Sequence, residues 1–215
     1  MKLLRRVIAL LLASGLSFTS LPAAIAADVR LIDLVSVTWP GAKATSVSLG
    51  NLQSAISTSV NPRWKSYTSF LGDTQDRSIS FEYGTSLTTP LSLTRPMSCA
   101  GADATTFMNS IRSETYKRLG FTDWKNRYLV ILSPNAGCIW EGRALIGDAK
   151  DRGGVITMHD SASGFVLTHE LGHALGLGHS NYLRCLDGKN DGPWGSNCSA
   201  LEYGGTVDVM GNFPV

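Results

Sequence analysis

The residues best suited to chemistry lie in one short segment, THELGHALGLGH, at positions 168–179. The chain has only four histidines, and three of them fall within this segment. His169 and His173 are four positions apart, so on a helix they share one face, with Cβ atoms about 5–6 Å apart. Two imidazoles at that separation can bind one metal ion at zinc–nitrogen distances of about 2.0–2.1 Å.

Glu170, Gly176 and His179 complete the pattern H-E-x-x-H-x-x-G-x-x-H. Glu170 emerges about 100° around the helix from His169, so it need not bind the metal and can act as general base toward an attacking water. Gly176 allows a backbone conformation closed to most residues, which can bring His179 to the same ion. Two histidines four apart are often only a solvated helix face. The complete pattern instead favours one catalytic zinc ion with three imidazole ligands and an open fourth position.

This pattern, followed by a methionine turn, resembles that of the metzincins. The methionine is Met210, in the segment EYGGTVDVMGNF at 202–213. Two further features support the resemblance: the segment LGLGHS at 175–180 and the loop between Cys185 and Cys198. Together with the methionine segment, they are most similar to the gametolysin (autolysin) type, over roughly residues 138–213. The resemblance implies an α/β (α+β zincin) fold, with a mixed twisted sheet and an active-site helix, and zinc endopeptidase activity. It also implies that the three histidines bind zinc, that Glu170 is the general base, and that Met210 forms a hydrophobic floor beneath the ion.

One feature departs from the family pattern. The chain ends five residues after Met210, whereas metzincins usually continue into a C-terminal helix and part of the pocket wall. We therefore expect either a fragment or a reduced C-terminal part.

The first 26 residues are typical of a secretory signal peptide. Lys2, Arg5 and Arg6 form a basic start, and an apolar run at 7–18 is too short to cross a bilayer as a helix. The small residues at 24–26 predict cleavage after Ala26. We therefore expect a secreted protein, extracellular or periplasmic, with a single metzincin-like domain at 27–215.

The charge balance limits the classes of partner. Three of the 19 basic residues lie in the first 26 residues, which contain no acid, so 16 basic residues remain against 17 acidic ones. A net charge of −1 does not suggest a nucleic acid or an anionic membrane surface as partner. The expected partner is a protein or peptide substrate, bound by a monomer.

Four cysteines lie beyond the predicted cleavage site: Cys99, Cys138, Cys185 and Cys198. An even count in an oxidising compartment predicts two disulfides, for which three pairings are possible. We favour the sequential pairing, 99 with 138 and 185 with 198. No C-x-x-C pair is present, which argues against a cysteine metal site. A Cys99 thiolate that blocks the metal until activation is the less favoured alternative.

The alternation of strand-like and helix-like segments predicts an α/β domain with a mixed sheet. Strands are predicted at residues 31–39, 78–83, 128–134, 142–148 and 153–160. Helices are predicted at 51–60, stopped by Pro62, from Asp103 or Thr105 to Leu119, and from Ser163 to Gly176. The last forty residues, dense in Gly, Asn and Asp, are predicted to be loop.

The expected function is hydrolysis of peptide bonds of extracellular proteins, with the substrate added as a strand on residues 153–160 or on the strand before them. A zinc-binding but silent adhesion or matrix-binding module is an alternative, against which the retained Glu170 argues. A hydrolase of a non-peptide amide or ester is another. Oxygen donors at 187–192 could bind calcium, but a plain turn is favoured because the calcium-loop pattern is missing. His159 is interpreted as an ordinary polar residue at a strand end.

Overall fold

The computed structural model describes residues 28–69, 78–148, 150, 152–186, 198–205 and 208–211. The predicted signal peptide and the segment 187–192 lie outside these residues. Among the helices of the described part, none is long and apolar enough to cross a membrane.

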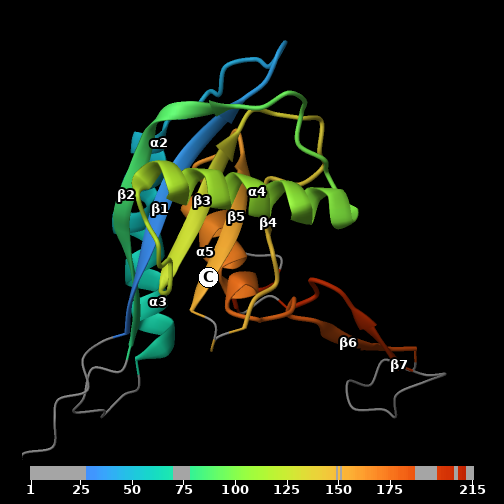
Figure 1. Cartoon of the computed structure of the whole chain (residues 1–215). Coiled ribbons are helices and arrows are strands. Elements are labelled where there is room, and N and C mark those ends of the chain that lie inside the picture. The colour runs from blue at the N-terminus through green and yellow to red at the C-terminus, as the bar shows by residue number, and fades with distance from the viewer. Residues whose placement is uncertain are drawn as a thin grey trace, which may run out of the picture.

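A five-stranded sheet forms the centre of the fold, in the order β2-β1-β3-β5-β4 (Figure 1). Its strands are β1 (Asp28–Thr38), β2 (Ile79–Ser92), β3 (Arg127–Ser133), β4 (Gly142–Ala144) and β5 (Gly153–His159). All pairings are parallel except that of β4 with β5, which is antiparallel, so the predicted mixed sheet is confirmed. β2 extends well beyond the predicted 78–83, because an edge strand tolerates residues such as Gly84 and Pro90 that weaken the sequence signal.

Helices cover both faces of the sheet (Figure 1). On one face lie α2 (Leu49–Ala55), η1 (Ile56–Val60), α3 (Asn61–Thr68) and α5 (Gly164–Ala174). They enclose an apolar layer that includes Leu52, Ile56 and Val60. On the other face α4 (Gly101–Leu119) packs over a second apolar layer. It ends at Leu119, as predicted, and the next residue, Gly120, caps it with a left-handed φ of 76°. The helix begins before the predicted Asp103, because its cap residue is an extended Ala100 that offers no side-chain signal.

The prediction that Pro62 ends a helix is wrong. α2 (Leu49–Ala55) continues directly into a π-helical turn, η1 (Ile56–Val60), and then into α3 (Asn61–Thr68). Pro62 lies in the first turn of α3, where a missing N–H costs little. The π-helical turn shifts the hydrogen-bonding register just before the proline, so the helical path continues.

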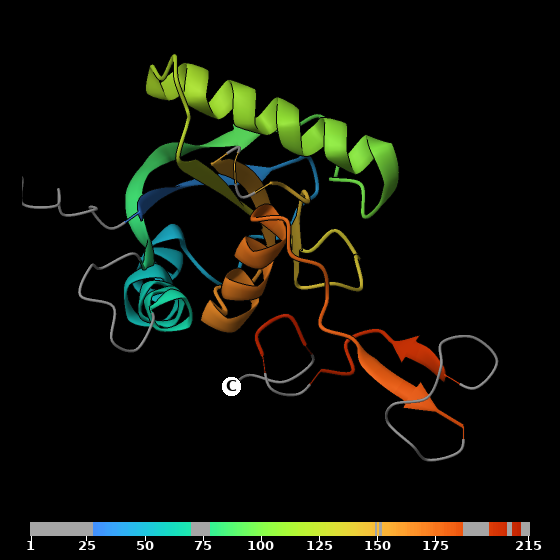
Figure 2. The same ribbon diagram turned by 90° about the horizontal axis from the view of Figure 1, so that it is seen from below.

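The motif lies on α5 (Gly164–Ala174), which begins after Ser163 as predicted. The Ser163 hydroxyl accepts a hydrogen bond of 3.2 Å from the Val166 N–H and so caps the helix. Beyond α5, the prediction of loop throughout is wrong, because β6 (Tyr182–Cys185) and β7 (Cys198–Leu201) form an antiparallel ribbon. Figure 2 shows this ribbon standing away from the sheet. Strands of four residues are too short to show a periodic pattern in sequence.

Both disulfides of the favoured pairing are present, Cys99–Cys138 and Cys185–Cys198. The alternative of a metal-blocking Cys99 thiolate is therefore wrong. Two disulfides are typical of an oxidising environment outside the cytosol. The second joins residues that face each other in the β6–β7 ribbon.

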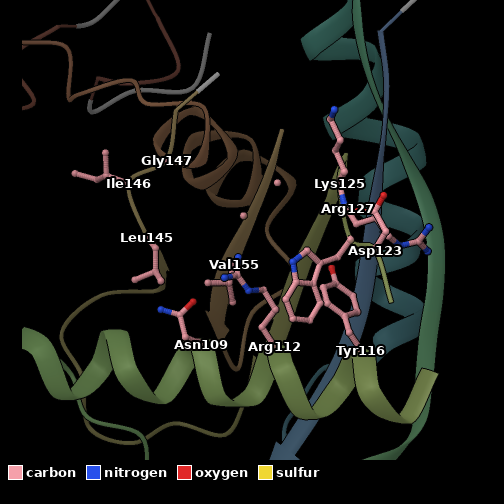
Figure 3. Close-up of a pocket in the computed structure, with 13 residues that line it drawn as sticks. Asn109, Arg112, Tyr116, Asp123, Lys125, Arg127, Leu145, Ile146, Gly147 and Val155 are labelled. Atoms are coloured by element: carbon pink, nitrogen blue, oxygen red, sulfur yellow. Dashed lines mark hydrogen bonds between the residues drawn. The ribbon is translucent and has the colours of Figure 1, made fainter. Parts of the chain in front are cut away.

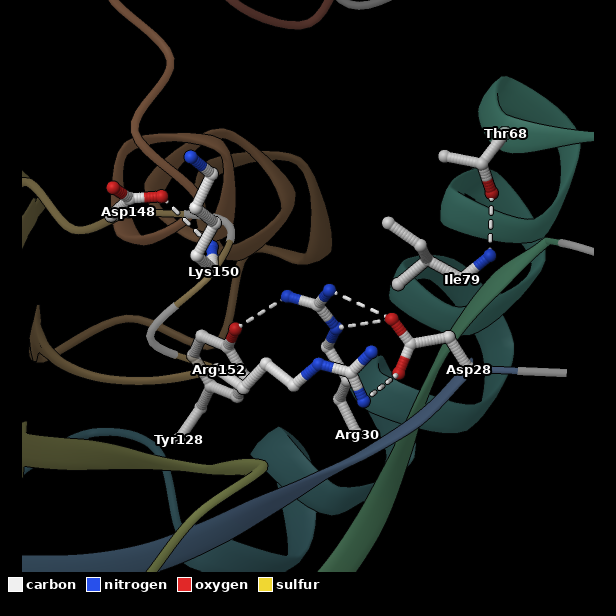
Figure 4. A network of polar contacts seen from close by, with 8 residues as sticks. All are labelled: Asp28, Arg30, Thr68, Ile79, Tyr128, Asp148, Lys150 and Arg152. Atoms are coloured by element: carbon white, nitrogen blue, oxygen red, sulfur yellow. Dashed lines mark hydrogen bonds and ion pairs between the residues drawn. The ribbon is translucent and has the colours of Figure 1, made fainter.

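A buried polar network fixes the beginning of β1 (Figure 4). The Arg30 side chain is almost fully buried. Its guanidinium donates to the Tyr128 hydroxyl at 2.7 Å and to the Asp28 carboxylate at 2.8 Å. Arg152 lies 3.5 Å from the other oxygen of that carboxylate. The network therefore ties β1 to β3 and to the residue before β5.

Candidate metal centre

The three motif histidines converge at the C-terminal end of α5 and the segment that follows it. One ring nitrogen from each of His169, His173 and His179 lies within 4.8 Å of the other two. The Nε2 atoms of His173 and His179 are 3.0 Å apart. Gly176 adopts a φ of 91°, the conformation predicted to turn the chain back toward the site. The predicted grouping of the three histidines is thus confirmed, and these residues could hold a metal ion.

Each histidine is oriented by an oxygen that faces its Nδ1 atom. His169 donates to the Val209 carbonyl at 2.7 Å and His173 to the Leu177 carbonyl at 2.8 Å. The Nδ1 of His179 lies 2.7 Å from a carboxylate oxygen of Glu202. A proton on Nδ1 leaves the Nε2 lone pair of each ring free for a metal, and such outer partners usually accompany metal-binding histidines.

The electrostatic environment suits neutral imidazole ligands. Burial lowers the pKa of His169, and the other two histidines lower it further. Burial also lowers the pKa of His173. Neutral imidazole nitrogens are ligands that zinc, copper, iron and nickel accept. The residues therefore fit a transition-metal ion without selecting one of these metals.

Glu170 lies buried beside this cluster, with 7% of its surface exposed. Burial raises the pKa of its carboxyl to about 7, although the Ala144 backbone N–H and the Arg143 charge both act in the opposite direction. A cation held by the histidines would lower this pKa again. Without such a cation, the side chain is placed to exchange a proton near neutral pH.

Edge strand β4 lies directly against Glu170. A Cβ atom added to Gly142 would come 2.5 Å from Val166 Cγ1, 2.8 Å from Glu170 Cγ and 3.0 Å from Glu170 Oε1. The glycine is therefore required for the strand to approach the carboxylate this closely. Two hollows of about 210 and 310 Å³ open beside Glu170, and both are bordered by Trp140, Gly142 and Tyr203.

Met210 is buried in the turn that follows Asp208, and it lies against α5 at Gly172. A Cβ atom added to Gly172 would collide with the Met210 sulfur. Gly172 thus allows the methionine to lie directly against the helix that carries the histidines. The same turn supplies the Val209 carbonyl that orients His169.

Two residues of the site were not assigned from sequence. Glu202 orients His179, and the Tyr203 ring lies against the same imidazole, tilted by 34° with ring centroids 3.7 Å apart. Tyr203 holds a φ of 59°, which is unusual for a residue other than glycine. Both precede the methionine turn in the quoted segment EYGG, but no spacing rule connects them to the histidines.

The remaining predicted residues support the site from outside it. The Cys99 carbonyl accepts hydrogen bonds from Trp140 Nε1 at 2.9 Å and Arg143 Nη1 at 2.8 Å. The Cys99–Cys138 disulfide thus supports the segment that leads into β4. His159 ends β5 as predicted, with its ring stacked on Trp140 at 4.8 Å between centroids.

Comparisons with known proteins add little to this description. No protein-family model and no curated protein matches the chain. Among solved structures, it is similar to a chain from a structure described as a chaperone–substrate complex, with 19% sequence identity and a TM-score of 0.33. The match covers 71% of this chain, which spans only 25% of the length of the other. A similarity this low carries no argument about fold or function.

Proposed function

We propose that this protein is a secreted, zinc-dependent endopeptidase of the metzincin type, with a single zinc ion bound by His169, His173 and His179. The observation that carries the proposal is the orientation of the three imidazoles. Each presents Nδ1 to an oxygen, so that the Nε2 atoms are free. A buried glutamate lies at the same cluster. Three imidazoles beside a general base are typical of a hydrolytic zinc site.

A zinc ion bound there would polarise the scissile carbonyl and make water a better nucleophile at neutral pH. Glu170 takes a proton from the attacking water and passes it to the nitrogen of the leaving amine. Burial and the Ala144 N–H hold its carboxylate in place. Each imidazole would bind the ion through Nε2, while its Nδ1–H continues to donate to the oxygen that orients the ring.

The substrate backbone extends the sheet at β4. The Glu141 carbonyl and the Leu145 N–H bond to β5, so the alternate residues Gly142 and Ala144 direct their backbone groups to the opposite side. The Ala144 N–H binds Glu170, which leaves both groups of Gly142 and the Ala144 carbonyl for a peptide. Of the two edges expected from sequence, β4 is favoured because β5 is paired on both sides.

The test compares purified wild type with Glu170→Gln, which keeps the shape of the side chain and removes the base. We expect one zinc per chain in both proteins, with casein cleavage only in the wild type. Glu114→Gln, on the exposed side of α4, serves as the control and should cleave at the wild-type rate. Zinc in both proteins without cleavage in either would favour the silent binding module. Absence of zinc from both would refute the proposal.

A further inference from the structure

A second cavity lies away from the histidines, between α4 and the sheet. This α4 pocket has a volume of about 440 Å³, and Figure 3 shows its lining residues. The residues that matter here are Arg112 and Tyr116 on α4, Trp124 in the loop before β3, and Gly153 and Val155 on β5. The volume lies within the range of small-molecule sites, about 300–1,000 Å³.

The hollow exists because one strand position carries no side chain. Val155 belongs to the apolar layer beneath α4. Side chains alternate between the faces of a strand, so Gly153 lies on the same face as Val155 but contributes nothing to fill it. The floor of the α4 pocket is therefore open at the beginning of β5.

The wall holds a buried polar group that has no well-aligned hydrogen-bond partner within the described residues. Tyr116 is fully buried, and its hydroxyl lies near the Asp33 carboxylate but outside good hydrogen-bonding geometry. Burial and the nearby Asp33 carboxylate raise the pKa of this hydroxyl, so it remains protonated and can donate. A buried hydroxyl without a partner costs free energy, and a ligand that accepts its proton would remove that cost.

The wall also holds an unpaired guanidinium. Arg112 lies over the Trp124 ring, 5.5 Å from its centroid, and makes no ion pair within the described part of the chain. The second arginine of the pocket, Arg127, is already neutralised by two hydrogen bonds of 2.8 Å to Asp33. Of the cations that line the pocket, Arg112 and Lys125 make no ion pair within the described residues. Asp123 also borders the pocket. The planar fork of Arg112 makes it the better match for a carboxylate.

We propose that the α4 pocket binds a carboxylate carried on an aromatic or bulky apolar group. Arg112 holds the carboxylate, Tyr116 donates a further hydrogen bond, and the apolar group packs on Trp124 and Val155. The ligand is either a free acid or the C-terminal residue of a peptide. Ile146 borders both this pocket and a hollow of the metal centre, so a peptide on β4 could reach it.

The first experiment measures binding by isothermal titration with phenylacetate and with phenylacetamide, its neutral counterpart. We expect the amide to bind about tenfold more weakly or worse. It cannot accept charge-assisted hydrogen bonds, whose greater strength corresponds to about a tenfold difference in affinity. Arg112→Gln should weaken phenylacetate binding to the same degree. Arg118→Gln, on the same helix but paired with Glu114 and outside the pocket, should bind like the wild type. Equal binding of acid and amide would overturn the proposal.

A second variant tests the cavity without changing its charge. Gly153→Val suits a strand and fills the floor of the α4 pocket, so phenylacetate binding should be lost while the circular dichroism spectrum is retained. Unchanged binding in this variant would overturn the proposal. All titrations include a chelator, so the result does not depend on the metal centre or on the proposed protease activity.

The two sources of the carboxylate are distinguished with acetyl-glycyl-phenylalanine and its C-terminal amide. Tighter binding of this peptide than of phenylacetate, with loss of binding by the amide, assigns the pocket to peptide C-termini. Tighter binding of phenylacetate assigns it to free acids. Binding of neither compound would overturn the proposal.

Discussion

His169 donates a 2.7 Å hydrogen bond from Nδ1 to the carbonyl oxygen of Val209, although 40 residues separate them in sequence. The bond joins the helix that carries two of the histidines to the turn that carries Met210. Because the carbonyl selects the tautomer and the ring orientation, the turn acts on the imidazole directly. The methionine turn is thus coupled to the proposed ligands through its backbone as well as through the methionine side chain.

Replacement of Glu202 by alanine should weaken zinc binding. Its carboxylate is the only oxygen described at His179 Nδ1, and loss of such a partner lowers metal affinity by about 10–100-fold. Competition with a chromogenic chelator measures the affinity. Glu114→Ala removes another exposed carboxylate, distant from the histidines in sequence, and should leave the affinity unchanged. Equal affinities in all three proteins would show that Glu202 does not support the metal.

Gly142→Ala should abolish most of the proposed peptidase activity without unfolding the protein. The added methyl would meet Val166 Cγ1 at 2.5 Å and Glu170 Cγ at 2.8 Å, and it would therefore push β4 away from α5 or displace the carboxylate. Misplacement of a catalytic group by about 1 Å can cost about 100-fold in rate. Gly50→Ala is the matched control, since its Cβ would meet only Ser48 Oγ at 3.5 Å. A Gly142→Ala variant as active as this control would contradict the placement of the base against β4.

His159 should make the folded state sensitive to acid. Its Nε2 accepts a hydrogen bond of 2.8 Å from the Ala136 N–H, and burial lowers its pKa below the ordinary value of 6.5. A lowered pKa favours the neutral form in the folded state. The resulting stability is complete above pH 6.5 and is lost as the pH falls through the folded pKa.

Urea unfolding at pH 7.5 and 5.5, with chelator present, tests this prediction. The wild type should lose more free energy of unfolding between the two pH values than His159→Gln, which cannot titrate. Both proteins retain the other three histidines, so their contribution cancels in the comparison. Identical losses would exclude His159 as a source of acid sensitivity.

The two disulfides should contribute unequally to stability. Cys99–Cys138 closes a separation of 39 residues and Cys185–Cys198 one of 13. Because the entropy removed from the unfolded chain grows with the logarithm of loop length, the longer bridge should stabilise by about 1 kcal/mol more. Urea unfolding of the two double-serine variants measures this difference. A larger loss from the 185–198 pair would show that chain entropy does not dominate.

The parts of the site that depend on local geometry could be predicted from sequence. The four-residue spacing of His169 and His173 and the glycine at 176 define their arrangement through helix periodicity and a single backbone conformation. The contributions of Glu202 and Val209 could not be predicted. Both act through contacts between segments that lie far apart in sequence, and a single carboxylate or carbonyl has no pattern of its own.

In the fold, too, the features set by local sequence could be predicted and the others could not. The buried strands and the two disulfides followed from hydrophobic runs and cysteine order. Pro62 misled the prediction because its effect depends on whether it lies in the first turn or the interior of a helix, and the π-helical turn before it leaves no sequence signal. The β6–β7 ribbon was missed because its two strands are only four residues long, too short to show a periodic pattern.

The Cys185–Cys198 bridge also makes the position of Glu202 independent of the length of chain between the two cysteines. Cys185 faces Cys198 across the ribbon, and Glu202 directly follows Leu201, the last residue of the second strand. The position of Glu202 relative to His179 is therefore set by the ribbon and not by the number of residues enclosed between the cysteines.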